Sequence, residues 1–596
     1  MAVFFGHAAP AADPLSYTVN FTPSGDATLD SLLRQTSALV SMRQKLPAGP
    51  LVLIARARAD ARQFAVVLHS LGYDDGRIAI TIGGDTLANP ALPGLLANLP
   101  ASQGVTVRII PHQGPVFRLG QVQTPGLPPG FKPPPGMVRP GQPALAAPIL
   151  AVVPALCTAL RNAGYAFAVV SQPLAVAHPA AQRLDVTYTI TPGPLVAIGP
   201  VAFAGLTRTS AAFLRAHIAL KPGQPFSDTA LAQARDSLLG LGVFASVTPL
   251  PASKPTARGL VPVTFRVVPK PRHAVTLSAL YASDTGLTLG TSWEDRDVFT
   301  HAERLKFTAA GNGLAATGTR APGYDLQAVF AKPDFAARGQ ILSLSLEALN
   351  ESLTAYSRKA VLARLTLSRP FGAHLSLTYG PQFITEQVRQ QGVNRDYALA
   401  QLPATLTYST AENLLEPTQG LNAGITATPT LPTAGTGKPF LIMLASASVY
   451  LPVEPAGRGV VALHGQVGSI QGASVFQVPP DQRFYAGGSG TVRGYTYQTI
   501  GPLFPDGTPE GGLAMDAGSL EFRQRVGKSF GLVPFIDAGQ VNSGSRPFAG
   551  TLRVGAGLGL RYYTSIGPIR LDLAFPFTRV AGSAGFALYV GFGESF

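Results

Sequence analysis

Hydrophobic and polar positions alternate with a period of two along the second half of the chain. Segments that show this alternation include AVTLSALYAS (274–283), QILSLSLEAL (340–349), AVLARLTLS (360–368), LIMLASASVYL (441–451) and RVGAGLGLRYY (553–563). Turn-forming runs such as PAGRG and SIGP separate the segments. Alternation of this kind predicts strands with one apolar and one polar face. The spacing of the segments over residues 272–596 predicts an all-β transmembrane antiparallel barrel of about 16 strands, apolar toward lipid and polar toward the lumen.

The longest interruption of the strand pattern lies between Gln471 and Gly512. This predicted loop contains a glycine-rich stretch, RFYAGGSGTVRGYTY (483–497). A long loop inside a compact domain is usually functional, so the stretch is the first candidate for a functional site.

Two strand patterns follow the loop and each contains an acidic residue. In GSLEFRQRV (518–526), Glu521 falls on the polar side and is expected to face the lumen. In VPFIDAGQV (533–541), the alternation is less regular, because Phe535 has the same parity as Asp537.

The first half of the chain combines helical and strand patterns. A helix is predicted over residues 228–241, with Ser227 or Asp228 as a favourable N-cap residue. Gly242 follows it, where a left-handed C-cap favours glycine. The strand patterns VFASVTPL and VPVTFRVV come next. This order of strand, helices, strand and strand predicts an α+β unit with helices on one face of a small sheet.

The α+β unit is repeated. GPVFRLGQVQTPG (114–126) matches GPLVAIGPVAFAG (193–205), and LRNAGYAFAVVSQ (160–172) matches LLGLGVFASVTPL (238–250). LHSLGYDDGRIAI (68–80) is a weaker third copy. Repeats of this kind mark one structural unit used several times. The predicted organisation is a residual signal or linker (1–13), α+β modules at 14–112, 113–192 and 193–271, and the barrel (272–596).

Composition limits the classes of protein that remain. Charged residues make up 13% of the chain and hydrophobic residues 46%, which argues against disorder. The net charge of +14 is thinly spread, so we expect a mildly basic surface near anionic lipid headgroups and no nucleic acid partner. The apolar run at 143–160 contains three prolines and is interpreted as a loop end followed by a core-facing helix. Cys157 within it is expected to be a core residue.

Two further features lie near the N-terminus and in the second module. Ala9-Pro10-Ala11 matches the small-residue pattern that precedes a signal-peptide cleavage site. A Pro-rich stretch at 125–143 predicts an exposed, extended excursion.

The glycine-rich stretch fails each template for a catalytic or nucleotide-binding loop. A nucleophile elbow needs a second glycine where Thr491 stands, and the dinucleotide pattern needs one at Arg493. A phosphate-binding loop ending at Ser529 would need glycine at Phe522. HExxH and CxxC are also absent from the sequence. We therefore expect a protein that is not an enzyme and uses no metal or cofactor.

Two sets of residues resemble one known family. The repeated unit, with its step from glycine to an aromatic residue after the second helix, resembles the POTRA domain of outer-membrane assembly proteins. TVRGY inside a long barrel loop is similar to the signature of the superfamily that contains BamA, TamA and two-partner-secretion transporters. The resemblance implies that the loop folds back into the lumen.

The resemblance also implies roles for the residues of the loop motif. Arg493, which follows Val492, would pair with Glu521, Asp537 or both, since its planar guanidinium can bind carboxylates bidentately. Gly494 would let the backbone turn closely, and Tyr495 would pack against the wall.

Two stretches near the end of the chain resemble the same family. FALYVGFGESF (586–596) resembles the terminal strand by which outer-membrane barrels are recognised for insertion, with Phe592 on its apolar face and Phe596 expected at the level of the aromatic girdle. IGPIRLDLAFPF (566–577) resembles the penultimate strand region of the family.

Three POTRA copies and a barrel in this length resemble the TamA family. The resemblance implies an outer-membrane insertase or translocase with periplasmic POTRA domains and a seam that opens between the first (274–283) and last (584–596) strands. Its partners would be unfolded outer-membrane and autotransporter chains, a TamB-like periplasm-spanning protein and outer-membrane lipid. The alternatives are a two-partner-secretion-type transporter with two POTRA domains and a general BamA-type assembly subunit. A passive channel and a soluble β-protein fit less well.

Overall fold

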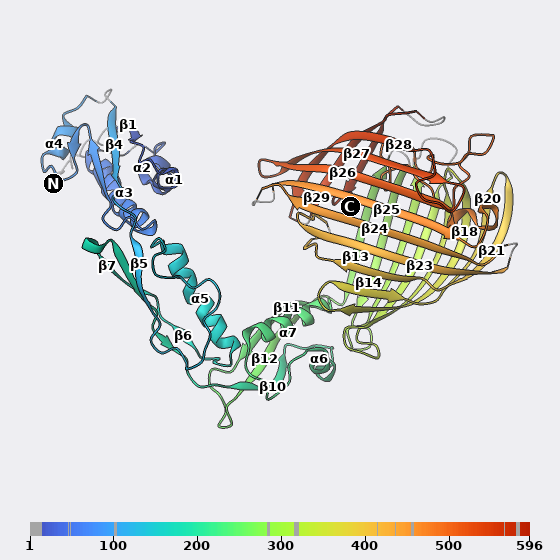
Figure 1. Ribbon diagram of the computed structural model, residues 1–596, viewed down its shortest axis with the longest axis horizontal. Coiled ribbons are helices and arrows are strands. Elements are labelled where there is room, and N and C mark those ends of the chain that lie inside the picture. Colours follow the sequence, from blue (N-terminus) through green and yellow to red (C-terminus); the bar gives the residue numbers. More distant parts are fainter. Residues whose placement is uncertain are drawn as a thin grey trace, which may run out of the picture. The chain divides into compact units, whose positions relative to one another are not determined.

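The computed structural model is shown in Figure 1, and the residues that it describes are 15–45, 47, 49–100, 104–282, 286–314, 321–413, 415–434, 437–454, 458–565, 567–579 and 585–596. The predicted signal or linker, 1–13, lies outside them. The chain forms two compact units. One unit comprises the residues up to Val201 together with 220–233 and 251–263, and the other comprises 202–219, 234–250 and 264–596. Residues of the predicted third module are therefore divided between the two units.

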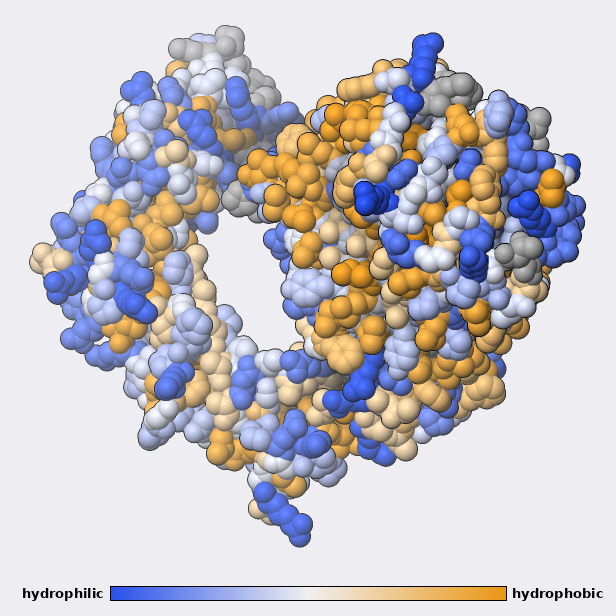
Figure 2. Space-filling view, turned by 45° about the vertical axis from the view of Figure 1, so that its right-hand side comes forward, coloured by the Kyte–Doolittle hydropathy of each residue, from blue (hydrophilic) through white to orange (hydrophobic). Residues whose placement is uncertain are grey.

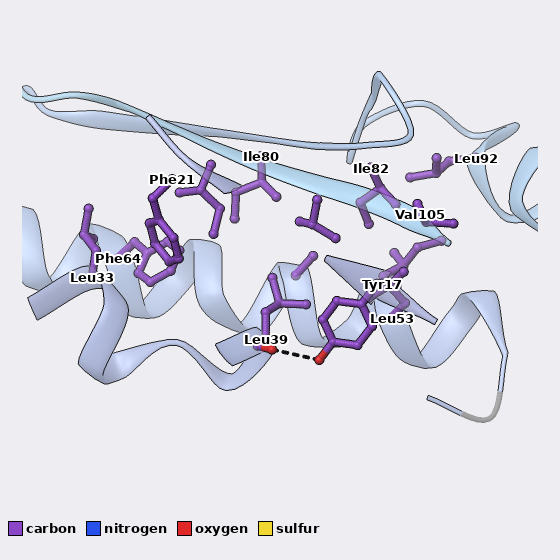
Figure 3. Close-up of a cluster of buried hydrophobic side chains, with 14 of the residues drawn as sticks. Tyr17, Phe21, Leu33, Leu39, Leu53, Phe64, Ile80, Ile82, Leu92 and Val105 are labelled. Carbon is purple, nitrogen blue, oxygen red and sulfur yellow. Dashed lines mark hydrogen bonds between the residues drawn. The ribbon is translucent and has the colours of Figure 1, made fainter. Parts of the chain in front are cut away.

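The first module packs helices on one face of a four-stranded sheet with the order β1-β4-β2-β3. Its elements are β1 (Tyr17–Phe21), α1 (Ala27–Thr36), α2 (Ala38–Ser41), α3 (Pro50–Ser70), β2 (Arg77–Ile82), β3 (Asp85–Thr86), α4 (Leu92–Ala97) and β4 (Val105–His112). Apolar side chains from the sheet and the helices meet in one core (Figure 3). Within it the rings of Phe21 and Phe64 lie 6.2 Å apart, and the Tyr17 hydroxyl donates to the Leu39 carbonyl at 2.8 Å.

The second and third modules both begin with a strand, continue with helix and end with strands, but they differ in the number of helices and strands. The second consists of β5 (Arg118–Gln123), α5 (Ala146–Asn162), β6 (Val169–Val170), β7 (Leu174–His178), β8 (Arg183–Thr187) and β9 (Ile190–Thr191). The third consists of β10 (Ala197–Ala204), α6 (Ala211–His217), α7 (Asp228–Gly240), β11 (Phe244–Pro251) and β12 (Leu260–Pro269). The second module has one long helix where the third has two, and the Pro-rich stretch at 125–143 lies in the connection between β5 and α5. Four short strands, β6 to β9, follow α5, whereas two strands follow α7.

Glycines end the long helix of each module. Gly72 follows α3, Gly164 follows α5 and Gly242 follows α7, with φ angles of 81°, 100° and 77° respectively. These angles lie in the left-handed region that side chains other than glycine rarely adopt. The glycines that recur in the sequence repeat therefore mark the ends of the long helices.

The apolar run at 143–160 forms a loop end and then α5, as predicted. Ile149, Val152, Leu156 and Leu160 are buried along one side of this helix, at the spacing of successive turns. Among the described residues, no helix has the length and apolarity needed to cross a bilayer.

The second half of the chain forms a closed antiparallel barrel from β13 to β30. Its strands are β13 (His273–Ala282), β14 (Gly286–Arg296), β15 (Arg304–Leu314), β16 (Gly323–Lys332), β17 (Ile341–Ser352), β18 (Ser357–Phe371), β19 (Leu375–Tyr379), β20 (Gln382–Gln390), β21 (Val393–Gln401), β22 (Ala404–Ser409), β23 (Gly420–Ala434), β24 (Phe440–Pro452), β25 (Gly459–Gln471), β26 (Ala514–Val526), β27 (Phe530–Asn542), β28 (Arg553–Thr564), β29 (Gly567–Pro576) and β30 (Ala587–Phe592).

Two of the barrel strands are broken by proline. β19 and β20 both pair with β18, along different parts of its length, and lie end to end on either side of Gly380-Pro381. β21 and β22 pair with β23 in the same way on either side of Leu402-Pro403. Proline lacks the N–H that a strand ladder uses, so each break is local. Counting each broken pair as one strand gives the predicted 16.

The outer wall of the barrel is apolar. Leu406, Ile425, Leu463, Leu520 and Ile536 are exposed on it. Hydrophobic residues cover much of the barrel wall that is visible in Figure 2. This is the surface expected of strands whose outer side chains meet lipid.

The predicted terminal strand, 586–596, is wrong at its C-terminal end. β30 stops at Phe592, and Gly593, with a φ of 83°, turns the chain inward. Glu594 then pairs with Arg561 on the lumen side, with Oε2 2.7 Å from Nε. The centre of the Phe596 ring lies 5.1 Å from that of His464, and Arg523 lies over the same ring. Phe596 therefore faces the lumen, whereas the residues of an aromatic girdle face outward.

Candidate functional site

The loop between β25 and β26, residues 472–513, folds back against the inner wall of the barrel with its motif residues buried, and we call it the lumen loop. It begins with two short 3-10 helices, Val475–Gln477 and Pro480–Gln482. Its motif residues Val492 and Tyr495 are fully buried, and Arg493 is 2% exposed. The motif at the centre of this 42-residue loop therefore packs like a core, whereas residues such as 505–507 are exposed.

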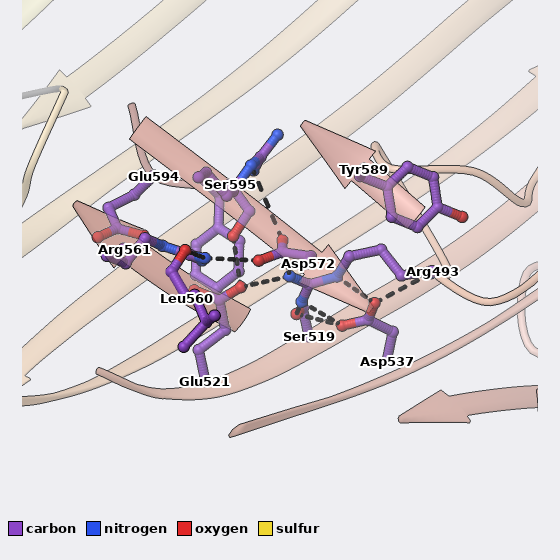
Figure 4. Close-up of polar contacts among 12 residues, drawn as sticks. Arg493, Ser519, Glu521, Asp537, Leu560, Arg561, Asp572, Tyr589, Glu594 and Ser595 are labelled. Carbon is purple, nitrogen blue, oxygen red and sulfur yellow. Dashed lines mark hydrogen bonds and ion pairs between the residues drawn. The ribbon is translucent and has the colours of Figure 1, made fainter. Parts of the chain in front are cut away.

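Arg493 is held by a bidentate pair with Asp537 of β27 (Figure 4). Its Nε donates to Asp537 Oδ2 at 2.7 Å and its Nη2 to Oδ1 at 2.8 Å. The backbone N–H of Arg493 also donates to Oδ2, at 3.0 Å. Parallel N–H···O bonds of this kind fix the guanidinium in direction as well as in position.

Three further wall groups reach the same guanidinium. Nη1 lies 2.7 Å from Glu521 Oε1 of β26 and 3.1 Å from Asp572 Oδ2 of β29. Nη2 donates to the hydroxyl of Ser519 at 3.1 Å. The structure thus brings Arg493 together with both sequence-predicted partners and with Asp572, which the sequence did not single out.

The irregular alternation of β27 has a direct reason. Phe535 and Asp537 both face the lumen, and the centre of the Phe535 ring lies 3.5 Å from the Arg493 guanidinium carbon. An aromatic face attracts a cation through its quadrupole. The ring covers the flat side of the guanidinium while the carboxylates take its edge.

The arginine belongs to a larger cluster in which charges are balanced. Its buried or partly buried members are four arginines and four carboxylates: Arg493, Arg523, Arg561, Arg570, Glu521, Asp537, Asp572 and Glu594. Ser595 also donates to Glu521. Because burial of an unpaired charge is costly, equal numbers of positive and negative side chains favour burial of the cluster against the barrel wall.

Gly494 lets the loop approach the wall. Its φ is 96°, and a Cβ at this position would lie 2.8 Å from the carbonyl carbon of Phe575 in β29. Its N–H donates to the Tyr589 hydroxyl of β30 at 3.2 Å, and the Tyr495 hydroxyl donates to the Val554 carbonyl of β28 at 3.1 Å. The motif therefore touches the last three strands of the barrel.

Gly555 is a second residue that the sequence did not reveal. It lies in β28 opposite Asp537, and a Cβ there would lie 2.1 Å from the carbonyl oxygen of Arg493. Glycines are common in these strands, so nothing local distinguishes this one. Asp572, in contrast, has a signal, since Arg570 and Asp572 alternate with the outward-facing Leu571 and Leu573.

The barrel closes through a narrow seam. Among the described residues, β13 and β30 pair at Tyr281–Val590 and Ala282–Tyr589, whereas β13 pairs with β14 from His273 to Ala282. The remaining length of β13 carries the strongly exposed Val275 and Leu277, at 68% and 80%. In the part of the seam that the structure describes, the edge of β13 is therefore largely unpaired, and the Arg493 cluster lies on the strands beside it.

Two family models match the chain. Residues 307–596 match the Omp85 superfamily domain, and residues 196–270 match the POTRA model, described as a surface antigen variable number repeat. Among curated proteins, the chain is 22% identical over 542 residues to the outer membrane protein assembly factor BamA of Neisseria meningitidis, a match that covers 79% of this chain and 66% of that protein. The BamA of Nitratidesulfovibrio vulgaris is 33% identical over 121 residues, 15% of its length.

Solved structures share the fold. BamA from Haemophilus ducreyi lacking POTRA domains 1–3 aligns with a TM-score of 0.63 at 18% identity, over 80% of this chain and all of that one. CdiB from Acinetobacter baumannii aligns with a TM-score of 0.50 at 14% identity, over 81% of this chain and 91% of that one.

Proposed function

This chain is a member of the Omp85 superfamily with a POTRA repeat before its barrel, and on that premise we propose that it inserts or translocates outer-membrane proteins. It is an outer-membrane protein whose POTRA domains lie in the periplasm. The role proposed is not enzymatic: the chain works by offering strand edges to a client and by opening its barrel sideways.

The observation that carries the proposal is the narrow seam. Within the described ranges, two residue pairs join β13 to β30, so few of the described ladder hydrogen bonds must break for the barrel to open there. An unpaired strand edge is a template on which another extended chain can add. A client strand could pair with β13 and leave toward lipid through the opened seam.

The second module offers another edge. β7 is the outer strand of the sheet β5-β8-β7, and each of its five residues is exposed. An extended peptide can add to such an edge through main-chain hydrogen bonds. We propose that it receives unfolded clients, including autotransporters, and that the modules dock a TamB-like partner while the barrel wall contacts outer-membrane lipid.

A disulfide across the seam is expected to abolish client insertion. Tyr281→Cys with Val590→Cys places cysteines at facing antiparallel positions, whose Cα separation falls within the range a disulfide spans. The background is Cys157→Ser, since Cys157 is the single native cysteine. The measurement is insertion of a barrel client into liposomes containing the oxidised protein, before and after addition of a reductant.

The matched control keeps one cysteine and moves the other. Tyr281→Cys with Leu287→Cys joins β13 to β14, which are fully paired already, and should leave insertion unchanged. Loss of insertion that reductant restores, in the seam variant alone, supports the proposal. Wild-type insertion by the oxidised seam variant would show that the seam need not open.

A two-partner-secretion-type transporter or a BamA-type subunit is the second candidate. The fold shared with both BamA and CdiB supports either. What co-purifies with the detergent-extracted protein separates them, because a TamB-like chain, a lipoprotein complex and a single secreted partner are distinct. A passive channel is less consistent with a lumen loop whose motif is fully buried.

A further inference from the structure

The lumen loop contacts a second part of the barrel wall at its base. Asp481 of the loop lies beside Arg358 of β18, with Oδ2 3.0 Å from Nη1. The same arginine pairs through Nε with Glu351 of β17 at 2.6 Å, and its Nη1 lies 3.6 Å from Glu386 of β20. The side chains of Asp481 and Glu386 are fully buried. We call this group the base contact.

Polar contacts extend the base contact along the neighbouring strands. Gln401 of β21 donates from Nε2 to Oε1 of Gln482 at 2.9 Å. The N–H of Ala355, in the β17–β18 turn, donates to Oε1 of Gln498 at 3.1 Å. Tyr485 of the loop packs in one apolar cluster with Ala355 and its wall neighbours. The base of the loop is thus fitted to the wall rather than resting beside it.

The two contacts lie on different sides of the barrel. With each broken pair counted once, the base contact uses strands five to eight of the 16, and the Arg493 cluster uses strands 12 to 16. In a closed barrel of this size, strands about eight apart face each other across the lumen. The loop therefore spans the lumen, from the wall beside the seam to the wall opposite it.

The polarity of the two contacts is reversed. At the seam side the loop supplies an arginine and the wall supplies carboxylates, whereas at the base the loop supplies Asp481 and the wall supplies Arg358. The base contact is also less balanced in charge. Three carboxylates share one arginine there, whereas the Arg493 cluster has four arginines for four carboxylates. Among the described residues, buried polar atoms without a hydrogen-bond partner occur in both groups. Because a buried carboxylate without a cation of its own is costly, the base contact holds the loop less strongly.

We propose that Arg358 is a positioning residue that holds the base of the lumen loop, and that the loop is a brace across the lumen whose base contact releases before the Arg493 contact. The brace is a property of the barrel itself. Only its link to seam opening rests on the function proposed above: one half of the barrel can move relative to the other when the base has been released.

The test measures how often each end of the loop leaves its wall. Ala355→Cys and, in a separate protein, Val492→Cys each place a thiol in a buried position, one under the base and one beside Arg493. In the Cys157→Ser background, a hydrophilic maleimide reacts with the thiol only when the covering segment opens. Arg358→Met is expected to raise the labelling rate at position 355 about tenfold, the change that corresponds to about 1.4 kcal/mol. Labelling at position 492 should stay within about twofold.

The control variant comes from the same strand. Arg364 of β18 pairs with Glu347 of β17 at 2.6 Å, a contact between two wall strands, so Arg364→Met should leave labelling at position 355 unchanged. Arg358→Lys should restore most of the protection, since it keeps the charge. Asp481→Asn removes the loop's own charge from the base contact and should raise labelling at position 355. Heat-modifiable migration confirms that each variant is folded.

Three results would overturn the proposal. They are unchanged labelling at position 355 in Arg358→Met and Asp481→Asn, an equal rise at both positions, and an equal rise at position 355 in Arg364→Met. No client is present in the assay. A failed seam experiment would therefore refute the proposed function and leave the brace standing, whereas unchanged labelling would refute the brace alone.

Discussion

Arg493→Ala is expected to destabilise the folded barrel by about 3–5 kcal/mol, the cost of removing one partner from a buried ion pair. The change leaves Asp537, Glu521 and Asp572 buried without the cation that they share. It also uncovers the Phe535 ring. The lumen loop should detach from the wall beside the seam, and client insertion should decrease as a result.

The measurement is heat-modifiable migration on cold gels together with the denaturation midpoint in detergent. Arg493→Lys should fall between wild type and Arg493→Ala, because lysine keeps the charge but loses the bidentate geometry. Arg525→Ala is the control: this arginine of β26 is about one-third exposed and pairs with Glu416, so its loss should cost less than about 1 kcal/mol. Wild-type folding and insertion by Arg493→Ala would contradict the role assigned to the arginine.

Gly555→Ala is expected to detach the lumen loop from the barrel wall, although it adds a single methyl group. The new Cβ would lie 2.1 Å from the backbone carbonyl oxygen of Arg493, and neither backbone can retreat as a flexible side chain could. Overpacking of this kind costs about 1–3 kcal/mol or more. The loss should appear as proteolysis within the loop and as reduced insertion, with β-sheet content retained.

Gly465→Ala is the matched control for this change. Gly465 is also a glycine of a barrel strand, and a Cβ there meets nothing within 4 Å, so the variant should behave as wild type. If Gly555→Ala kept the loop protected from protease, the wall and the loop would not approach as closely as described.

The strands could be predicted because the signal for each one lies within its own sequence. Period-two alternation is local, and it located β17, β18, β24 and β28 without any knowledge of their neighbours. The helix ends at Gly72, Gly164 and Gly242 could be predicted in the same way, because the left-handed conformation that ends a helix favours glycine at that one position.

The site could be predicted only in part, because it depends on how distant strands meet. Parity shows that Asp572 faces the lumen, but which inward-facing acids surround Arg493 depends on the register and tilt of five strands. Arg358 and Asp481 lie far apart in the sequence, and neither stands in a motif. Phe596 was misplaced because alternation continues past Gly593, while the chain turns inward to bring Glu594 to Arg561.

The position of Arg493 in the chain has a consequence for the order of folding. The wall residues that contact its side chain, and the Tyr589 hydroxyl that binds Gly494, all come later in the sequence. The wall site that binds the loop therefore cannot form until β26 to β30 are in register. Up to that moment the guanidinium has no wall carboxylate to meet. A seated loop thus marks a barrel built through to β30, and a barrel that lacks those strands leaves the arginine with nothing to hold it.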